Sequence, residues 1–316
     1  MLKELPKLLF LILFINNLYT QSESKKILFV GHAFGSHQVP DNNIDPLLLK
    51  FHNENNKIYD ELILGGDFIY DCRNNEEFEN FYNFFKSNNV NFVIGNHENC
   101  EQVLSLNETF NKRENHYELV GNNLILFLNT SKEDNQEINN TIEYIDKIIE
   151  EESPSNIIVF THQLIFSDSD WHIRVNSRKY YDYANKVYLE IFKKYYKRKK
   201  KFYFIAGDIG AFKYTPFAFY DKDLNFNFLA SGIGNGNNSL GLLIDIDTNV
   251  DFRFIDLKTL VLYDPGRFSK IKVQIYQLPK LILSILKKNY LFSLSIIVTL
   301  ILVYLFQNRL KKNDIQ

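Results

Sequence analysis

The sequence lacks an excess of charge of either sign. Its 36 Lys and Arg residues nearly balance 38 Asp and Glu residues, and the formal net charge is −2 at pH 7. Binding to the phosphate backbone of a nucleic acid requires a basic surface, so we expect no nucleic-acid partner. One basic run, at residues 193–201, ends a helical pattern and is interpreted as a solvated helix end that complements the helix dipole.

Internal repeats and long Pro-rich or Ser-rich linkers are also absent from the sequence. Its 316 residues could hold one large domain or two small ones. Hydrophobic residues make up 45% of the chain and include 28 Phe and 19 Tyr, which is enough for a sizeable core. The composition therefore predicts a globular protein.

Cysteine is scarce. The chain contains only two, Cys72 and Cys100. Each follows closely behind a cluster of polar residues that ends an apolar run. In an oxidising compartment these two thiols could form a disulfide, and chance placement of two cysteines is the competing interpretation.

Long apolar runs occur only near the two ends of the chain. Residues 1–22 begin with lysines, continue with an apolar stretch at residues 8–14 and end in small polar residues, which is the layout of a secretory signal peptide. The apolar stretch is too short to span a bilayer, since a spanning helix needs about 20 residues. The segment has no Ala-x-Ala cleavage pattern, so an uncleaved anchor is the alternative.

Residues 290–306 contain no charged residue and are followed by Arg309, Lys311 and Lys312. A buried core helix is the alternative, but such a helix would show a polar face. The pattern predicts a transmembrane helix, preceded by a juxtamembrane stalk at residues 263–289 and followed by a basic cytoplasmic tail at residues 307–316. We therefore expect a single-pass membrane protein whose main domain, residues 24–262, lies outside the cytoplasm.

Within the main domain, strand-like runs alternate with helical patterns. The expected strands are residues 26–30, 61–64, 91–94, 157–160 and 202–206. The expected helices are residues 76–86, 137–151 and 180–199. Residues 117–129 and 242–257 each join two β-rich runs across a turn and predict antiparallel hairpins. Together these patterns predict an α/β fold with mixed sheets.

Five polar clusters stand directly after strand-like runs. They are Gly31-His32, Gly66-Asp67, Gly95-Asn96-His97-Glu98, Thr161-His162 and Gly207-Asp208. Each cluster alone is ordinary turn chemistry. Five of them in succession supply carboxylate, imidazole and amide ligands at strand ends, which is what a metal site needs.

With these motifs assembled, the sequence resembles the calcineurin-like metallophosphoesterases over about residues 24–262. The Gly95-Asn96-His97-Glu98 tetrapeptide is the most specific motif, accompanied by Gly66-Asp67, His162 and Gly207-Asp208. The resemblance implies a layered sandwich of mixed β-sheets flanked by helices, to which the sequence adds the C-terminal transmembrane helix. It also implies metal-dependent hydrolysis of a phosphate ester.

The resemblance implies a role for each matching residue. Asp67 would bind metal and share in catalysis, with Asn96 and His162 as further ligands. His97 would protonate or hydrogen-bond the leaving group. Glu98 would lie behind these residues and orient His97.

Two departures from the family's motifs change the expected metal site. His32 stands where the family has an aspartate, and Phe34, two residues later, cannot coordinate a metal. Asp208 and Gly210 stand where the family has two histidines. We expect one strong site for Mn, Fe, Zn or Mg, formed by Asp67, Asn96, His162 and Asp208. His32 would join this site or hold a second, doubtful metal together with Asp67.

Two further residues have open interpretations. Asp71 is either a helix N-cap or a carboxylate behind the metal ligands. Arg174 is either a partner of the substrate phosphate or a solvated loop residue.

We therefore expect a membrane-tethered, metal-dependent phosphoesterase acting on a phosphorylated substrate of unknown type. The alternative is a degenerate relative that binds a metal or a phosphorylated or glycan ligand without turnover. The altered motifs favour the alternative, and the retained His97 favours catalysis. A purely structural domain ranks last, because Asp67 and Asp208 would repel one another without a metal.

Overall fold

A computed structural model describes residues 24–34, 44–87, 89–98, 100–103, 114–131, 134–165, 190–195, 200–209, 217–221, 226–233 and 239–269. The chain divides into two units, residues 1–270 and 271–316, and all described residues belong to the first. The predicted signal peptide, transmembrane helix and cytoplasmic tail lie outside the described residues, as does most of the predicted stalk. None of the helices in the described ranges is long and apolar enough to cross a membrane.

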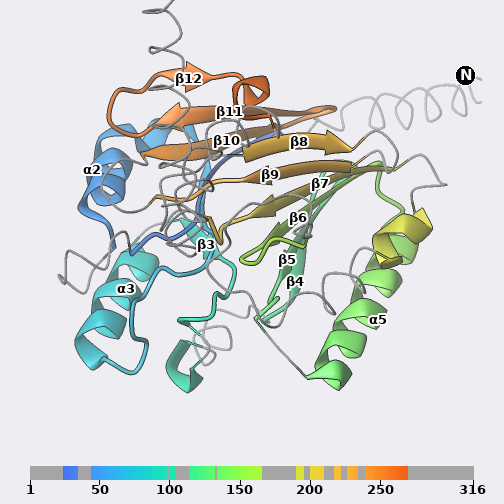
Figure 1. Ribbon diagram of the computed structural model, residues 1–316, viewed down its shortest axis with the longest axis horizontal. Coiled ribbons are helices and arrows are strands. Elements are labelled where there is room, and N and C mark those ends of the chain that lie inside the picture. The colour runs from blue at the N-terminus through green and yellow to red at the C-terminus, as the bar shows by residue number, and fades with distance from the viewer. Residues whose placement is uncertain are drawn as a thin grey trace, which may run out of the picture. The chain divides into compact units, whose positions relative to one another are not determined.

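The first of two sheets has six strands in the order β12-β11-β10-β1-β2-β3 (Figure 1). Its strands are β1 (Lys25–Val30), β2 (Glu61–Leu64), β3 (Val90–Phe92), β10 (Leu240–Ile246), β11 (Val250–Asp256) and β12 (Leu262–Tyr263). The strands β1, β2 and β3 are parallel neighbours, whereas β10 pairs antiparallel with both β1 and β11. The carboxyl ends of β1 and β2 therefore lie at the same edge of the sheet.

The second sheet also has six strands, in the order β4-β5-β6-β7-β9-β8. Its strands are β4 (His116–Val120), β5 (Asn123–Leu128), β6 (Asn156–Thr161), β7 (Lys201–Ala206), β8 (Phe217–Asp221) and β9 (Phe226–Ala230). The strands β5, β6, β7 and β9 run parallel, and β4 and β8 pair antiparallel at the two edges. In β5 and β6 every residue is buried, as expected for the interior of a parallel sheet.

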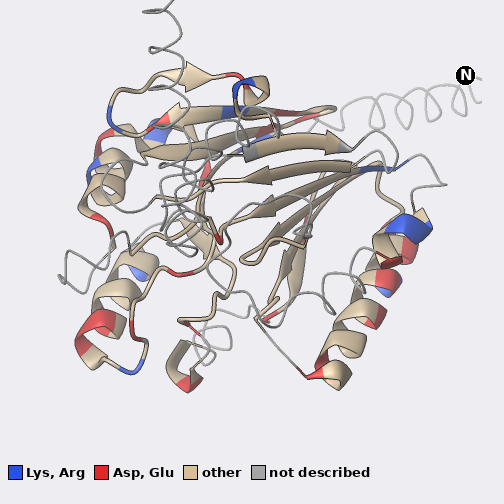
Figure 2. Ribbon diagram, viewed as in Figure 1, with Lys and Arg blue, Asp and Glu red and all other residues tan. Residues whose placement is uncertain are grey.

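In the part of the chain that the structure describes, three α-helices have both ends defined. They are α2 (Pro46–Asn55), α3 (Asn75–Ser87) and α5 (Asn135–Glu152); the 3₁₀ helices are η1 (Asn56–Ile58) and η2 (Pro265–Phe268). Asp45 and Asp134 cap α2 and α5 by accepting backbone N–H groups of the first turn. Charged side chains mark α3 and α5, while most of the strand residues are uncharged (Figure 2).

Among the described residues, two apolar clusters on the faces of the first sheet hold these layers together. Side chains of both sheets form one core, in which Phe29 of β1 stacks on Phe160 of β6 with 5.4 Å between ring centroids. The other face of the first sheet packs against α2 and α3, through residues such as Phe51 and Phe81. The structure is therefore a sandwich of two mixed sheets with helices outside, which confirms the predicted α/β fold.

The predicted strands and hairpins agree with the observed ones to within two residues at each end. Helix α2 and the β8–β9 hairpin were not predicted. Of the helix expected at residues 180–199, the structure describes residues 190–195, which are helical. The N-cap interpretation of Asp71 needs correction. Asn74 accepts the backbone N–H of Glu76 at 3.0 Å at the start of α3, while Asp71 lies in the preceding turn and accepts the N–H of Arg73.

Candidate metal centre

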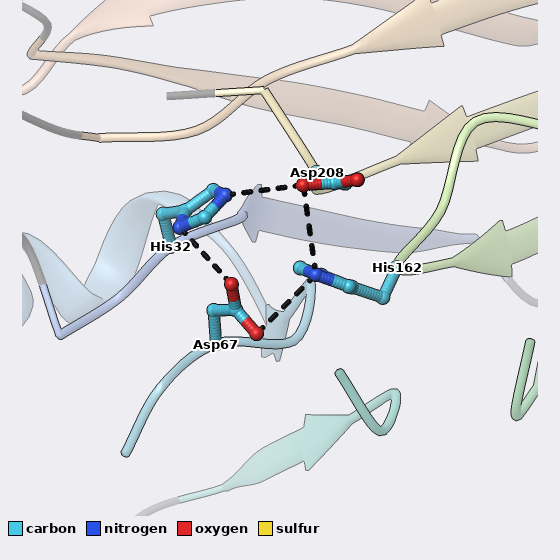
Figure 3. Close-up of side chains that lie close together, drawn as sticks. All are labelled: His32, Asp67, His162 and Asp208. Atoms are coloured by element: carbon cyan, nitrogen blue, oxygen red, sulfur yellow. Dashed lines mark ion pairs between the residues drawn. The ribbon is translucent and has the colours of Figure 1, made fainter. Parts of the chain in front are cut away.

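Four strand ends from the two sheets meet at one place. His32 follows β1 and Asp67 follows β2, while His162 follows β6 and Asp208 follows β7. Figure 3 shows the four side chains facing one another. The parallel arrangement within each sheet and the packing of one sheet on the other together bring these residues to a common point.

The four side chains form a compact cluster that we call the His-Asp cluster. One ligand atom from each residue lies within 4.8 Å of the other three, and all four residues are buried. His162 Nε2 lies 3.3 Å from Asp67 Oδ1 and 3.8 Å from Asp208 Oδ1. His32 Nδ1 lies 3.4 Å from Asp67, and its Nε2 lies 3.5 Å from Asp208. These separations exceed ordinary hydrogen-bond lengths, so the groups surround a common point instead of bonding tightly to one another.

The backbone is strained where it presents two of these ligands. His32 and Asp67 have φ angles of 51° and 50°, in a region that residues other than glycine rarely adopt. The N–H of His32 donates to the carbonyl of Gly66 at 3.0 Å, which ties the two strand ends together. Strain of this kind is typical of functional sites, because the surrounding structure must hold it in place.

A contact on the other side of its ring orients His162. Its Nδ1 donates to the carbonyl of Gly65 at 2.8 Å, and its Nε2 is therefore the nitrogen that points at the two carboxylates. That buried Nε2 makes no hydrogen bond to any described residue. Gly66 leaves room for the ring, since a Cβ there would lie 2.4 Å from Nδ1.

The charges of the His-Asp cluster depend strongly on one another. Burial disfavours the charged form of Asp67, but His162 and His32 outweigh this effect and hold the pKa of its carboxyl well below its usual range. Burial alone would lower the pKa of His162, but Asp67 and Asp208 raise it to about 10. Protonated imidazole thus balances the two buried carboxylates, and a bound cation would supply the same positive charge.

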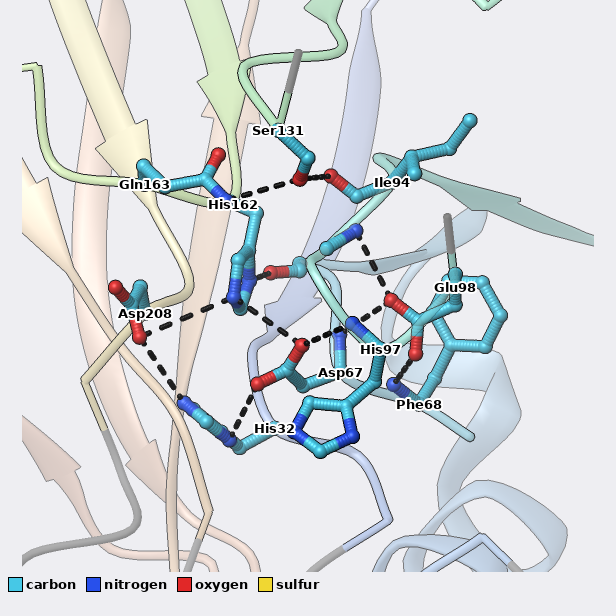
Figure 4. Close-up of polar contacts among 12 residues, drawn as sticks. His32, Asp67, Phe68, Ile94, His97, Glu98, Ser131, His162, Gln163 and Asp208 are labelled. Atoms are coloured by element: carbon cyan, nitrogen blue, oxygen red, sulfur yellow. Dashed lines mark hydrogen bonds and ion pairs between the residues drawn. The ribbon is translucent and has the colours of Figure 1, made fainter. Parts of the chain in front are cut away.

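Glu98 holds the loop that carries Asp67. Its Oε2 accepts the backbone N–H groups of Asp67 and Gly95 at 2.8 and 2.9 Å, and its Oε1 accepts that of Phe68 at 2.8 Å (Figure 4). Oε1 also accepts the backbone N–H of Ile69 at 2.9 Å. Burial and the negative charge of Asp67 raise the pKa of Glu98 to about 7, although its N–H donors favour the ionised form. The side chain thus positions Asp67, a role that differs from the predicted one of orienting His97.

His97 lies beside the cluster and is held by a different group. Its backbone N–H points at Asp67 Oδ1 at 3.5 Å, and its ring Nδ1 donates to the carbonyl of Tyr70 at 2.6 Å. The bond to Tyr70 keeps the proton on Nδ1, so Nε2 is the ring atom that can exchange a proton with a ligand. Sequence reasoning missed Tyr70, because a backbone carbonyl has no sequence signature.

The remaining predicted site residues have different placements. Asn96 is exposed, and its role as a ligand stays a prediction. Asp71 is exposed in the turn before α3. Arg174 lies outside the described residues. Cys72 and Cys100 form a disulfide with 6.3 Å between their Cα atoms, which joins the loop after Asp67 to the turn after Glu98.

The His-Asp cluster fits a cation of hard-to-borderline preference. Two imidazoles and two carboxylates are the donors that Mn, Fe and Zn accept, and the carboxylates suit Mg as well. The bond from His162 to the Gly65 carbonyl is the support that metal-binding histidines usually have. The fold and the cluster together define an α/β protein with a candidate metal site at its strand ends.

Comparisons with known proteins agree with this description. A model of the calcineurin-like phosphoesterase family matches residues 26–197. A dimetal phosphatase from Danio rerio is similar in structure, with a TM-score of 0.50 and 10% identity, covering 73% of this chain and 95% of the phosphatase. A purple acid phosphatase from yellow lupin has a TM-score of 0.51 and 14% identity, covering 77% of this chain and 53% of the lupin chain. A search of curated proteins found no match.

The family model covers more than half of the sequence, and the chain belongs to the calcineurin-like phosphoesterase family. This membership supports a hydrolase acting on phosphoric ester bonds. The two structures share the fold, and their identities are too low to carry residue roles across.

Proposed function

We propose that the protein is a membrane-tethered phosphoesterase that hydrolyses a phosphate ester with the help of one metal cation. The observation that carries the proposal is the His-Asp cluster, in which four buried ligand atoms lie within 4.8 Å of one another. A cation bound there would lower the pKa of a water molecule and neutralise charge on the phosphoryl oxygens. Family membership supports the reaction class, and the cluster supports this location for the reaction.

Each residue of the site would have its own role. His32, Asp67, His162 and Asp208 would hold the cation. Glu98 would fix Asp67 through its bonds to the Asp67 loop. His97, with its Nδ1 proton held by the Tyr70 carbonyl, would use Nε2 to donate a proton to the leaving oxygen.

A single cation is favoured over a pair. Among the residues that the structure describes, only the His-Asp cluster brings together three or more His, Cys, Asp or Glu side chains suited to a metal. The ring of Phe34 lies next to His32, with 5.8 Å between ring centroids, and it offers no ligand atom. Phe34 therefore places an apolar surface beside the cluster.

The sequence alone supports two parts of the proposal. They are the membrane tether and the position of the main domain outside the cytoplasm. The uncharged segment at residues 290–306 and the apolar stretch at residues 8–14 support them. Extraction of cell membranes with carbonate would test the tether, since an integral protein stays in the pellet. Recovery of the chain in the supernatant would contradict it.

Metal analysis and kinetics of the purified full chain test the catalytic part of the proposal. We expect about one equivalent of metal and turnover of a generic aryl phosphate that a chelator abolishes. Asp67→Asn should remove both metal and turnover, whereas His97→Ala should keep the metal and lose about 10²-fold to 10⁴-fold in kcat. Asp245→Asn is the matched control, because this carboxylate is exposed on β10. Undiminished turnover in both site variants would refute the assignment.

A further inference from the structure

A group of aromatic rings lies beside the His-Asp cluster and has no role in holding a metal. The rings of Phe34 and His97 lie 5.3 Å apart between centroids, those of Tyr70 and His97 lie 5.6 Å apart, and those of Phe34 and Tyr70 lie 5.8 Å apart. We call these three residues the aromatic group. Phe34 also contacts the ring of His32, so the group borders the cluster directly.

Within this group Tyr70 differs from Phe34 in its exposure. The Phe34 side chain is almost buried, at 9% exposed, whereas Tyr70 is 48% exposed. Burial of a large aromatic side chain is favourable, so a Tyr ring kept half in solvent next to a reactive site presents apolar area to a ligand.

The backbone beneath this exposed ring is fixed on both sides. The N–H of Tyr70 donates to Glu77 Oε2 at 3.1 Å, and its carbonyl accepts from His97 Nδ1 at 2.6 Å. Glu77 is itself buried, and the disulfide from Cys72 anchors the chain two residues further on. A ring on a rigid backbone loses little conformational entropy when a ligand packs against it.

The Tyr70 ring lies next to His97, the residue proposed to contact the leaving oxygen. The leaving oxygen must lie next to His97 Nε2 for a proton to pass between them, since proton transfer requires hydrogen-bond contact. The atoms attached to that oxygen then lie against the rings that adjoin His97. Among the described residues, Phe34 and Tyr70 are rings of this kind.

We propose that Tyr70, backed by Phe34, forms a subsite for a planar aromatic leaving group, so that the substrate is an ester of phosphate with an aromatic alcohol or an aromatic-bearing alcohol. This inference rests on the proposed function, because it takes His97 as the group next to the leaving oxygen. Offset or edge-to-face packing on Tyr70 would give the aromatic ester its advantage.

A pair of substrates with equally good leaving groups tests the subsite. Phenyl phosphate and hexafluoroisopropyl phosphate release alcohols of similar acidity, so a difference between them reports on binding of the ring. We expect the full-length wild-type protein to prefer the phenyl ester. Tyr70→Leu should raise the KM for phenyl phosphate on the order of tenfold, leave its kcat nearly unchanged and leave both constants for the alkyl ester unchanged.

Two variants separate this role from a structural one. Tyr70→Phe keeps the ring and should retain the preference for the phenyl ester. Tyr220→Leu is the matched control, because Tyr220 is 46% exposed on β8, and it should behave as wild type.

The outcomes distinguish the inference from the proposed function. If Tyr70→Leu lowers activity on both esters equally, or leaves the preference intact, the subsite is wrong and the phosphoesterase proposal stands. If the metal-loaded wild-type protein hydrolyses neither ester, the proposed function fails and the subsite falls with it.

Discussion

The carboxylate of Glu98 accepts the backbone N–H of Asp67 at 2.8 Å, across 31 positions in the sequence. The same carboxylate accepts three more N–H groups, from Phe68, Ile69 and Gly95. One buried side chain therefore fixes the loop that presents Asp67, a proposed metal ligand, in a strained conformation. Hydrogen bonds to a charged acceptor are among the stronger ones in proteins, which suits this task.

We expect Glu98→Gln to destabilise the protein by about 3 kcal/mol, because an amide nitrogen cannot accept a hydrogen bond and would leave buried N–H donors unsatisfied. Metal affinity should fall in parallel, since Asp67 loses its support. Urea unfolding and a metal titration measure the two effects. Glu101→Gln, at an exposed position, is the control and should change neither. Wild-type stability in Glu98→Gln would show that these hydrogen bonds do not hold the loop.

Metal binding should depend on residues from both sheets. Asp208→Asn and His32→Ala should each lower the bound metal well below one equivalent, because each removes one of four ligands. Metal should also raise the Tm of the wild-type protein and leave that of Asp208→Asn nearly unchanged, since a ligand stabilises only the state that binds it. Elemental analysis and thermal unfolding with and without a chelator measure these quantities. Full metal content in both variants would place the cation elsewhere.

Two of the described glycines have positive φ and offer a matched pair of substitutions. Gly66 has φ +78°, and a Cβ there would lie 2.4 Å from His162 Nδ1, whereas Gly121 has φ +56° and nothing within 4 Å of the added atom. We expect Gly121→Ala to cost about 1 kcal/mol of stability through backbone strain alone. Gly66→Ala should cost more and also reduce metal binding, because the His162 ring must move. Equal effects of the two substitutions on metal binding would contradict the tight packing of Gly66 on His162.

The disulfide should contribute measurably to stability. Cys72 and Cys100 are 28 residues apart, and closing a loop of this length in the unfolded chain corresponds to about 3.5 kcal/mol. Replacing both by Ser should lower the free energy of unfolding by about this amount, and a reducing agent should have the same effect on the wild-type protein. Two free thiols in the non-reduced protein, counted under denaturing conditions, would show that the bond does not form.

Much of the fold follows from the sequence because its signals are local. Apolar runs ended by glycine or threonine and then a polar residue predicted β1, β2, β6 and β7 to within a residue at each end. Asp45 and Pro46 form a recognisable start for helix α2. The helix was nevertheless missed, because the apolar residues of its first turn do not show the regular spacing that is typical of a helix. The β8–β9 hairpin, with five residues in each strand, was also missed.

The candidate site was also predicted only in part from the sequence. His32, Asp67, His162 and Asp208 were selected from sequence, since strand-end motifs are visible in it. The contacts of Glu98 were not, because an acceptor that bonds to backbone N–H groups 31 positions away leaves no pattern. The position of Tyr70 beside His97 was not predicted either, because a hydrogen bond from a side chain to a backbone carbonyl leaves no sequence pattern.

Local sequence patterns specify which residues stand at the ends of the strands, because alternation of apolar runs and turn residues is encoded position by position. Which of these residues meet depends on how the two sheets pack. His32 and Asp67 belong to one sheet and His162 and Asp208 to the other, so the packing of the two sheets sets the distances among them. That packing depends on side-chain volumes across the whole interface, which no local pattern specifies.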